Sequence, residues 1–492
     1  MSISQTIFDF TTLAIQAGGW MDLDRLYLHN RLLALIGEDS LGETISQKPQ
    51  QSSVELLDQL IMQAQKNGVI TDTPQKEILE SQLMDFLTPP PSVVNALFAQ
   101  QYAKSPQEAT DYFFELCKTN DYIKTRAIAK NIVFPVETEY GELEITINLS
   151  KPEKDPKQIA AARNVTAVNY PKCMLCMENE GYQGRVNYPA RTNHRIIRMN
   201  LDGESWGFQY SPYAYYNEHC IILAEEHRPM KISKETFERL LRITEVLPHY
   251  FVGSNADLPI VGGSILSHDH YQGGRHTFAM ANAPIEKNVT LSDFPNVQAG
   301  IVKWPLSVIR LQSAKQEELV EAAEFIFEKW RDYSDYSVEI SAYSEDGTPH
   351  HTVTPIARRK DNLFELDLVL RDNNVSEEHP DGIFHPHQDV QHIKKENIGL
   401  IEVMGLAVLP PRLATELVEV EKYLLGEVNQ IAPYHLKWAN ELKTNYTFTK
   451  ETTEAILRKE VGLIFARVLE DAGVFKRDEQ GQAAFARFIE VL

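Results

Sequence analysis

The spacing of the apolar residues changes twice along the chain, and this constrains the fold more than any other feature. Residues 1 to about 130, and again from about 415 to the end, carry apolar side chains at intervals of three and four. That spacing is typical of amphipathic helices. The stretch between them mixes short strand-like runs with helical ones. The order along the chain is therefore helical, mixed, mixed, helical.

Within the mixed stretch, two runs have helical spacing and several shorter runs have the alternation or composition of strands. The expected helices are 234–250, for which Ser233 is a suitable cap, and 315–331. The expected strands are 142–149, 194–200, 218–224, 258–265, 353–357 and 363–371. We therefore expect four regions: a helical part at 1–135, mixed halves at 136–305 and 306–430, and a helical tail at 431–492.

Charge and cysteine usage exclude several classes of protein. The chain has 48 Lys and Arg against 69 Asp and Glu, a net charge of −21, and so much acid argues against a nucleic-acid binder. Four cysteines are too few for a disulfide scaffold in 492 residues and fit a reducing compartment. Neither a signal pattern nor an uncharged apolar run near the ~18 residues of a membrane span is evident. We expect a cytoplasmic protein that binds neither membranes nor nucleic acid.

The most informative motif for chemistry is 262–274, GGSILSHDHYQGG. His268, His270 and Gln272 are spaced at i, i+2 and i+4, so in an extended segment all three project from one face. Histidine suits nucleophilic attack on phosphorus, because neutral imidazole is abundant at pH 7 and a carbonyl can hold its second nitrogen. Glutamine can donate a hydrogen bond to a phosphoryl oxygen but cannot act as an acid. The alternative is a pair of ordinary strand histidines; the flanking glycines, which let a ligand approach the backbone, favour a functional site.

A second motif, Cys173-x-x-Cys176, indicates metal binding or redox chemistry. The flanking Pro171 and the acids that follow favour a zinc knuckle over a redox helix. A closed Cys2His2 site needs two histidines. His227, just after an expected strand, and His268 are the candidates, with His219 as the competing third ligand. Two free cysteines in a turn remain the alternative.

A third group of histidines and lysines lies further on, between 350 and 397. For the segment His385-Pro386-His387 we favour a surface turn, because proline and nearby acids are common there. Lys394 and Lys395 precede a strand-like run at 398–409, and a lysine there could neutralise a sugar phosphate. An exposed lysine without such a role is the alternative.

The combination of CxxC, an EEH after a strand, and HxHxQ resembles the galactose-1-phosphate uridylyltransferases, a branch of the histidine-triad superfamily. The stretches SHDHYQGG, AIQAGGWMDLDRLYLHNRLL and KKENIGLIEVMGLAVLP are similar to the type 2 class. The resemblance spans nearly the whole chain. It implies an α+β fold of two related halves, each an antiparallel sheet flanked by helices, with helical additions at both ends. It also implies small-molecule substrates and a homodimer.

The resemblance implies a ping-pong reaction. UDP-glucose gives its uridylyl group to a histidine and releases glucose 1-phosphate, and galactose 1-phosphate then takes the group to become UDP-galactose. By this resemblance His270 is the nucleophile and Gln272 contacts the phosphate. The implied ligands of a structural Zn²⁺ are Cys173, Cys176, His227 and His268. The implied substrate-binding residues are Asn255, Ser264, Lys395 and Glu402. No organic cofactor is expected.

Two departures from the type 1 enzymes are visible. Asp269 and Tyr271 stand where those enzymes have Pro and Gly. Their second metal site uses a His-x-His that here reads Glu365-Leu366-Asp367, so we do not expect that site, although Glu286 could match its carboxylate ligand. The rival functions are a nucleotide hydrolase or dinucleotide phosphorylase of the same superfamily, and a non-catalytic, zinc-stabilised UDP-sugar-binding protein. The residues leave the identity of the hexose open.

Overall fold

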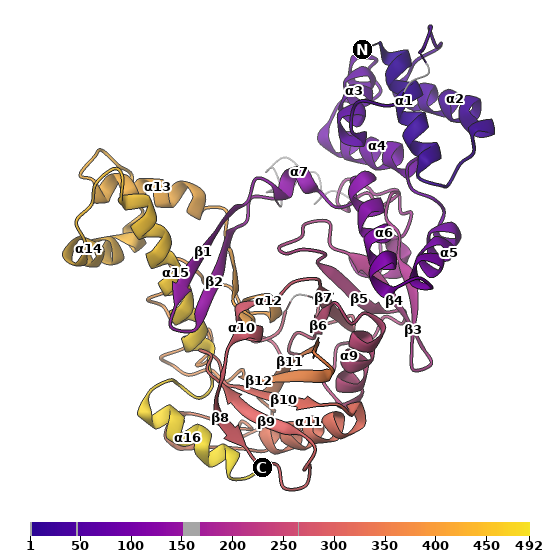
Figure 1. Cartoon of the computed structure of the whole chain (residues 1–492). Helices are drawn as coiled ribbons and strands as arrows, with labels where there is room; N and C mark the ends of the chain where they lie inside the picture. The colour runs from indigo at the N-terminus through magenta and orange to yellow at the C-terminus, as the bar shows by residue number, and fades with distance from the viewer. Residues whose placement is uncertain (1, 46–47, 151–167, 264) are drawn as a thin grey trace. The chain divides into compact units, whose positions relative to one another are not determined.

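The protein is described here by a computed structural model that covers residues 2–45, 48–150, 168–263 and 265–492 (Figure 1). The chain forms two compact units. The first contains Met1–Ile128, Lys151–Ala214 and Cys220–Arg228, and the second contains Ala129–Ser150, Tyr215–His219 and Pro229–Leu492. Both units combine helices with antiparallel strands, so the predicted α+β class is confirmed. The predicted four regions have boundaries different from those of these two units, and that division stays a prediction.

The first unit begins with a helical bundle whose helices start at identifiable caps. The side chains of Ser2, Ser52 and Asp72 accept hydrogen bonds from the first-turn amides of α1, α3 and α4. Apolar residues of α1 to α4 form one buried cluster. The helices of this unit are α1 (Ile3–Gln16), α2 (Arg25–Ile36), α3 (Ser53–Lys66), α4 (Thr73–Asp85), α5 (Pro91–Tyr102), α6 (Pro106–Thr119) and α7 (Thr125–Ile128). Strands β3 (Ile197–Leu201), β4 (Glu204–Tyr210) and β5 (Cys220–Ala224) pair antiparallel in that order.

The second unit is built on a larger antiparallel sheet with the strand order β7-β6-β11-β12-β10-β9-β8. Its strands are β6 (Phe251–Gly253), β7 (His270–Gly274), β8 (Ile285–Val289), β9 (Gln298–Val302), β10 (Val308–Ser313), β11 (His351–Lys360) and β12 (Leu363–Asp372). Helices α9 (Lys234–Val246) and α11 (Gln316–Arg331) bury apolar faces and contact strands of this sheet. Ser233 is the N-cap of α9, where its amide donates to Thr236 Oγ1 at 3.2 Å. Both predicted helices are therefore confirmed.

A second, small sheet of this unit joins distant parts of the chain. The hairpin β1 (Ile132–Thr138) and β2 (Gly141–Ile147) pairs with β13 (Leu406–Leu409), which runs parallel to β2. The remaining helices are α10 (Ala279–Asn282), α12 (Leu400–Val403), α13 (Leu413–Leu424), α14 (Leu436–Asn445), α15 (Thr453–Ala472) and α16 (Glu479–Ile489). Helix α15 lies tightly on β1: a Cβ on Gly462 would be 2.5 Å from the side chain of Val136.

Four charged side chains form a network in the larger sheet, three of them buried and Arg358 partly buried. Asp367 accepts two hydrogen bonds from Arg310, at 2.7 and 2.9 Å, and one from Arg358 at 2.7 Å. Arg358 also pairs with Glu365. Burial alone would raise the pKa of Asp367, but the charges of Arg358 and Arg310 outweigh it and lower that pKa. The motif Glu365-Leu366-Asp367 thus takes part in a buried ion-pair network.

The predicted strand at 258–265 is wrong. Apart from an isolated bridge between Ala256 and Gly262, the described part of this segment consists of a bend, a turn and irregular backbone, and Ile260 has φ +72°. Its β-branched residues suggested a strand, but Pro259 and the glycines interrupt a ladder, and Val261 is buried through tertiary packing. The run at 398–409 is helical over α12 before it becomes β13. Within the described residues, no helix combines the length and apolarity that a membrane crossing needs.

Candidate active site and metal cluster

The HxHxQ segment lies at the start of β7, and only its second half is a strand. β7 begins at His270, so His270 and Gln272 alternate onto the same face of the strand. His268 precedes it in a bend. The expectation that all three side chains project from one strand is therefore correct for His270 and Gln272 and wrong for His268.

The ring of His270 is held in one tautomer. Its Nδ1 lies 2.7 Å from the backbone carbonyl oxygen of His268, which can only accept, so Nδ1 carries the proton and donates. The lone pair is then on Nε2. Burial lowers the pKa of His270 to about 4, and the His268 carbonyl only partly offsets this effect. A buried, neutral imidazole with an unprotonated Nε2 has the protonation state that a nucleophile needs.

The side chain of Gln272 is oriented by His219, which the sequence indicated as a candidate metal ligand. His219 Nε2 lies 3.0 Å from Gln272 Oε1. Since an amide oxygen only accepts, His219 donates this hydrogen bond and leaves the Gln272 NH2 group facing away from it. The proposed alternative, His219 as a metal ligand in place of His227, is wrong, because its ring nitrogen contacts Gln272 and it does not belong to the metal cluster.

Asn255 follows the end of β6 by two residues, and β6 pairs with β7. Gly253 of β6 pairs with Gln272 of β7, and continuing this antiparallel register by two residues leads from Asn255 to His270. The Asn255 side chain is fixed because its Oδ1 accepts from the Leu400 amide at 2.9 Å. A Cβ on Gly263 would lie 2.5 Å from Asn255 Cγ, so this position has room only for glycine.

The two lysines before α12 have different surroundings. Lys394 is buried, and its Nζ donates to Glu402 Oε1 at 2.8 Å and to the Val408 carbonyl at 2.9 Å. Burial would lower its pKa, but the Glu402 carboxylate raises that pKa above its usual value. Glu402 also accepts from the Gly399 amide at 3.1 Å. Lys395, the residue expected to bind phosphate, is exposed and lines a cavity of about 800 Å³ that is also lined by Arg412.

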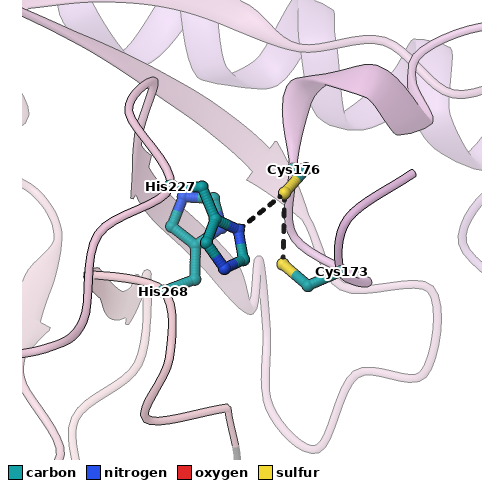
Figure 2. Close-up of side chains that lie close together, drawn as sticks. All are labelled: Cys173, Cys176, His227 and His268. Atoms are coloured by element: carbon teal, nitrogen blue, oxygen red, sulfur yellow. Dashed lines mark hydrogen bonds between the residues drawn. The ribbon is translucent and has the colours of Figure 1, made fainter. Parts of the chain in front are cut away.

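The predicted metal ligands lie together. Cys173 Sγ is 3.3 Å from Cys176 Sγ, which is 3.1 Å from His227 Nδ1. Figure 2 shows these three side chains with that of His268, and the ligand atoms of all four lie within 4.8 Å of one another. Two thiols and two imidazoles are a donor set that Zn²⁺ prefers, and ligand atoms about 2.0–2.3 Å from a tetrahedral ion are themselves roughly 3.3–3.8 Å apart. The residues therefore fit a zinc site.

The prediction of a surface turn at His385-Pro386-His387 is wrong for His385. This side chain is 4% exposed, and its Nε2 lies 3.2 Å from Asn397 Oδ1. His387 is partly buried and its Nε2 donates to the Ile383 carbonyl at 2.9 Å. The apolar segment around these residues is packed into the unit, which composition alone did not indicate.

Two further expectations concern single residues. Ser264 lies outside the described residues. Glu286 forms a two-pronged ion pair with Arg477, at 2.8 and 2.9 Å. The sequence did not predict two of the contacts seen here. These are the contact of His219 with Gln272 and that of Lys394 with Glu402. Of these contacts, the sequence contained a clue only to that of Lys394, because Lys394 adjoins Lys395, the residue predicted to bind phosphate.

Comparisons with known proteins indicate the family of the chain. Residues 19–229 match the family described as "Galactose-1-phosphate uridyl transferase, N-terminal domain", and residues 243–440 match the corresponding C-terminal domain. The chain is 62% identical to the galactose-1-phosphate uridylyltransferase of Enterococcus faecalis, over 99% of this chain and 98% of the relative. It is 60% identical to the protein of the same name from Streptococcus pneumoniae, over 98% and 97%.

Among solved structures, the yeast Ap4A phosphorylase Apa2 aligns with a TM-score of 0.35 at 10% identity. The alignment covers 72% of this chain and 93% of that chain. A likeness this low supports no conclusion about the present protein.

Proposed function

The chain belongs to the galactose-1-phosphate uridyl transferase family, and from this membership we propose how its own residues carry out the reaction. The protein is a nucleotidyltransferase of galactose metabolism that acts on UDP-glucose and galactose 1-phosphate. We propose that the uridylyl group passes through a covalent bond to His270. The observation that carries this proposal is the 2.7 Å hydrogen bond that fixes the proton of His270 on Nδ1.

In the first half-reaction the Nε2 lone pair of His270 attacks the α-phosphorus of UDP-glucose. An N–P bond forms, the bond from the α-phosphorus to the bridging oxygen breaks, and glucose 1-phosphate leaves with that electron pair. No proton has to be removed from Nε2, because the His268 carbonyl keeps the proton on Nδ1. The imidazole becomes positively charged as the N–P bond forms, and the same carbonyl stabilises that charge.

The second half-reaction reverses these steps with another acceptor. A phosphate oxygen of galactose 1-phosphate attacks the same phosphorus, the N–P bond breaks, and UDP-galactose leaves. His270 returns to its neutral form. Splitting the exchange into two displacements means that the site need hold only one sugar phosphate at a time. The position of His270 on β7 holds its ring in place for the attack, and such positioning of a reacting group lowers the barrier.

Gln272 would donate its amide N–H to a phosphoryl oxygen as charge develops there. Its Oε1 is already engaged by His219, so the NH2 group is the end available to substrate. An amide cannot protonate the covalent intermediate, which favours transfer over hydrolysis. Asn255, Ser264, Lys395 and Glu402 are proposed, from the family resemblance, to bind the phosphates and the sugar.

The Cys173, Cys176, His227 and His268 side chains would hold one Zn²⁺, which would supply structural cross-linking rather than Lewis-acid chemistry. His268 would then have two roles. Its side chain would bind the ion, and its backbone carbonyl accepts the hydrogen bond from His270. A homodimer and a cytoplasmic location stay predictions from the sequence, and light scattering of the purified protein would test the first.

One assay separates this function from its rivals. Incubation with UDP-glucose and labelled glucose 1-phosphate, without galactose 1-phosphate, should move label into UDP-glucose. A hydrolase would instead release UMP at a rate matching transfer, and a binding protein would exchange no label. A panel of hexose 1-phosphates as acceptors, including N-acetylated sugars, then establishes the sugar specificity.

A further inference from the structure

His219 and Gln272 form a partly buried contact, two residues along β7 from the proposed nucleophile. His219 is 5% exposed, and burial lowers its pKa to about 4, so the ring is neutral at pH 7. Its Nε2 contacts Gln272 Oε1 at 3.0 Å, whereas its Nδ1 has no hydrogen-bond partner in the described part of the chain. One nitrogen of a neutral imidazole carries the proton and the other carries a lone pair.

The unpaired nitrogen decides which tautomer is present. A buried N–H without a partner is rarer in proteins than a buried acceptor without one. The unpartnered Nδ1 of His219 therefore carries the lone pair, and Nε2 carries the proton. A donor at Nε2 requires an acceptor, so the Gln272 amide must present Oε1 to His219. The opposite amide orientation would place N–H against N–H.

The segment that carries His219 is docked on β7 at several points. The Tyr216 hydroxyl donates to the Gly273 carbonyl at 3.1 Å, and the Tyr216 and His219 rings stack with centroids 4.4 Å apart. A Cβ on Gly274 would lie 2.7 Å from the Tyr216 ring. The packing of Tyr216 against Gly273, Gly274 and the His219 ring thus sets the position of His219 relative to Gln272.

The residue before His219 has an unusual backbone conformation. Glu218 has φ +53°, the left-handed region that disfavours residues with a Cβ. Its carboxylate is held by an ion pair with Arg275 at 2.8 Å and by a hydrogen bond from the Tyr250 hydroxyl. Strained residues held in place by their surroundings cluster at functional sites. Here the residue with the left-handed backbone immediately precedes His219, whose ring contacts Gln272.

We propose that His219 is a positioning residue for the transfer: its Nε2–H fixes the amide of Gln272 so that the NH2 group faces the phosphoryl group. The inference rests on the proposed function of Gln272. The free NH2 group is consistent with it, because no hydrogen bond to another described residue occupies that group. Without His219 the amide would sample both orientations, and only one of them donates to the substrate.

The test compares His219→Phe with His219→Gln. Phe keeps a ring beside Tyr216 but removes the donor, whereas the amide of Gln places a donor near the position of Nε2. The readout is exchange of labelled glucose 1-phosphate into UDP-glucose. Loss of one neutral hydrogen bond should lower kcat by about ten-fold in His219→Phe, with KM changed by about two-fold or less. His219→Gln should restore most of kcat.

A double variant separates positioning from a general loss of structure. If His219 acts through Gln272, His219→Phe should cost nothing further in a Gln272→Ala background. The inference would be overturned if the losses of kcat multiplied in the double variant, or if kcat were unchanged in His219→Phe. It would also be overturned if both His219 variants lost the same kcat and the same Tm. Absence of label exchange in the unaltered protein would instead overturn the proposed function, and the inference with it.

Discussion

The Nδ1 atom of His270 lies 2.7 Å from the backbone oxygen of His268, so a backbone group sets the protonation state of the proposed nucleophile. We predict that His270→Asn keeps the fold and lowers kcat for both half-reactions by about 10⁴-fold or more, because the attacking group is gone. Acid-labile label from UDP-[α-³²P]glucose should be recovered on His270 of the unaltered protein. His350→Asn is a matched control on a partly buried histidine elsewhere. Label on another residue, or transfer by His270→Asn, would refute the assignment.

Zinc content is the second prediction. Elemental analysis of purified protein should find about one Zn²⁺ per chain, since two thiolates and two imidazoles close a tetrahedral site. Cys173→Ser should lower Tm and zinc content more than it changes the kcat of the protein that remains folded. Cys117→Ser, a buried cysteine far along the chain from the cluster, is the control that should retain zinc. Full activity and stability in a zinc-free preparation would remove the site.

The third prediction distinguishes the two lysines. Lys394→Ala leaves the Glu402 carboxylate without its buried partner, which should cost roughly 3–5 kcal/mol of stability. Lys395→Ala should leave Tm nearly unchanged, because this side chain is exposed. If Lys395 binds the sugar phosphate, kcat/KM should fall by about ten- to a hundred-fold, the cost of one charge-assisted hydrogen bond. Thermal melts and steady-state kinetics on both variants decide, and an unchanged kcat/KM would exclude Lys395 from the site.

The fourth prediction concerns the buried ion-pair network. Asp367→Asn should destabilise the protein by about 3–5 kcal/mol, because Glu365 would be left as the single carboxylate facing the charges of Arg310 and Arg358. The exposed Asp361→Asn is the matched control, with an expected change within about 0.5 kcal/mol. Urea titrations that give equal midpoints for the two variants would show that the network adds nothing to stability.

The fifth prediction is a pH dependence. His219 has a pKa of about 4 when folded, because of burial, against about 6.5 unfolded. Below pH 6.5 the unfolded chain binds a proton that the folded chain does not, so stability falls from pH 6.5 toward pH 4. Between pH 7 and pH 5 the loss from this residue should be about 2 kcal/mol. His219→Gln, which cannot titrate, should show that much less acid destabilisation in urea titrations.

The comparison with His219→Gln cancels other acid-sensitive groups, including the histidines of the metal cluster. The groups facing His219 are Tyr215 and Tyr216 on its own segment and Gln272 on β7, and none of them is a carboxylate or a histidine. Glu218 and Arg275 are paired with each other. Equal pH slopes in the variant and the unaltered protein would contradict the prediction.

The parts of the fold that depend on local periodicity could be predicted from the sequence. Helices α9 and α11 begin within one residue of their predicted starts, because spacing and a cap at Ser233 are local signals. Strands β2, β11 and β12 were also predicted, because the alternation or composition of a strand is a local signal too. The segment 258–265 was not, because its strand-like composition was outweighed by Pro259 and by left-handed backbone at Ile260. The N-terminal extent of β3 was also misplaced, since that strand starts at Ile197.

In the candidate site, residues within one motif could be predicted and partners from distant segments could not. Cys173 and Cys176 came from a single local pattern, and His270 and Gln272 from another. The contact between His219 and Gln272 depends on how the Tyr215–His219 segment packs on β7, 53 residues further along the chain. The choice between Lys394 and Lys395 required their burial. No periodicity encodes such tertiary information, so the motifs alone did not indicate that Lys394 is buried against Glu402 or that His219 contacts Gln272.

The parallel pairing of β13 with β2 has a consequence for biosynthesis. Ile145 pairs with Ala407, so about 260 further residues must be synthesised after β2 before β13 can complete the sheet. At 5–20 residues per second the ribosome needs roughly 13–52 s to deliver them. During that time the edge of β2, with its apolar Ile145 and Ile147, is open to wrong partners. Nascent chains halted before residue 406 should therefore bind chaperones and be cleaved at the hairpin by protease, whereas released full-length chains should resist.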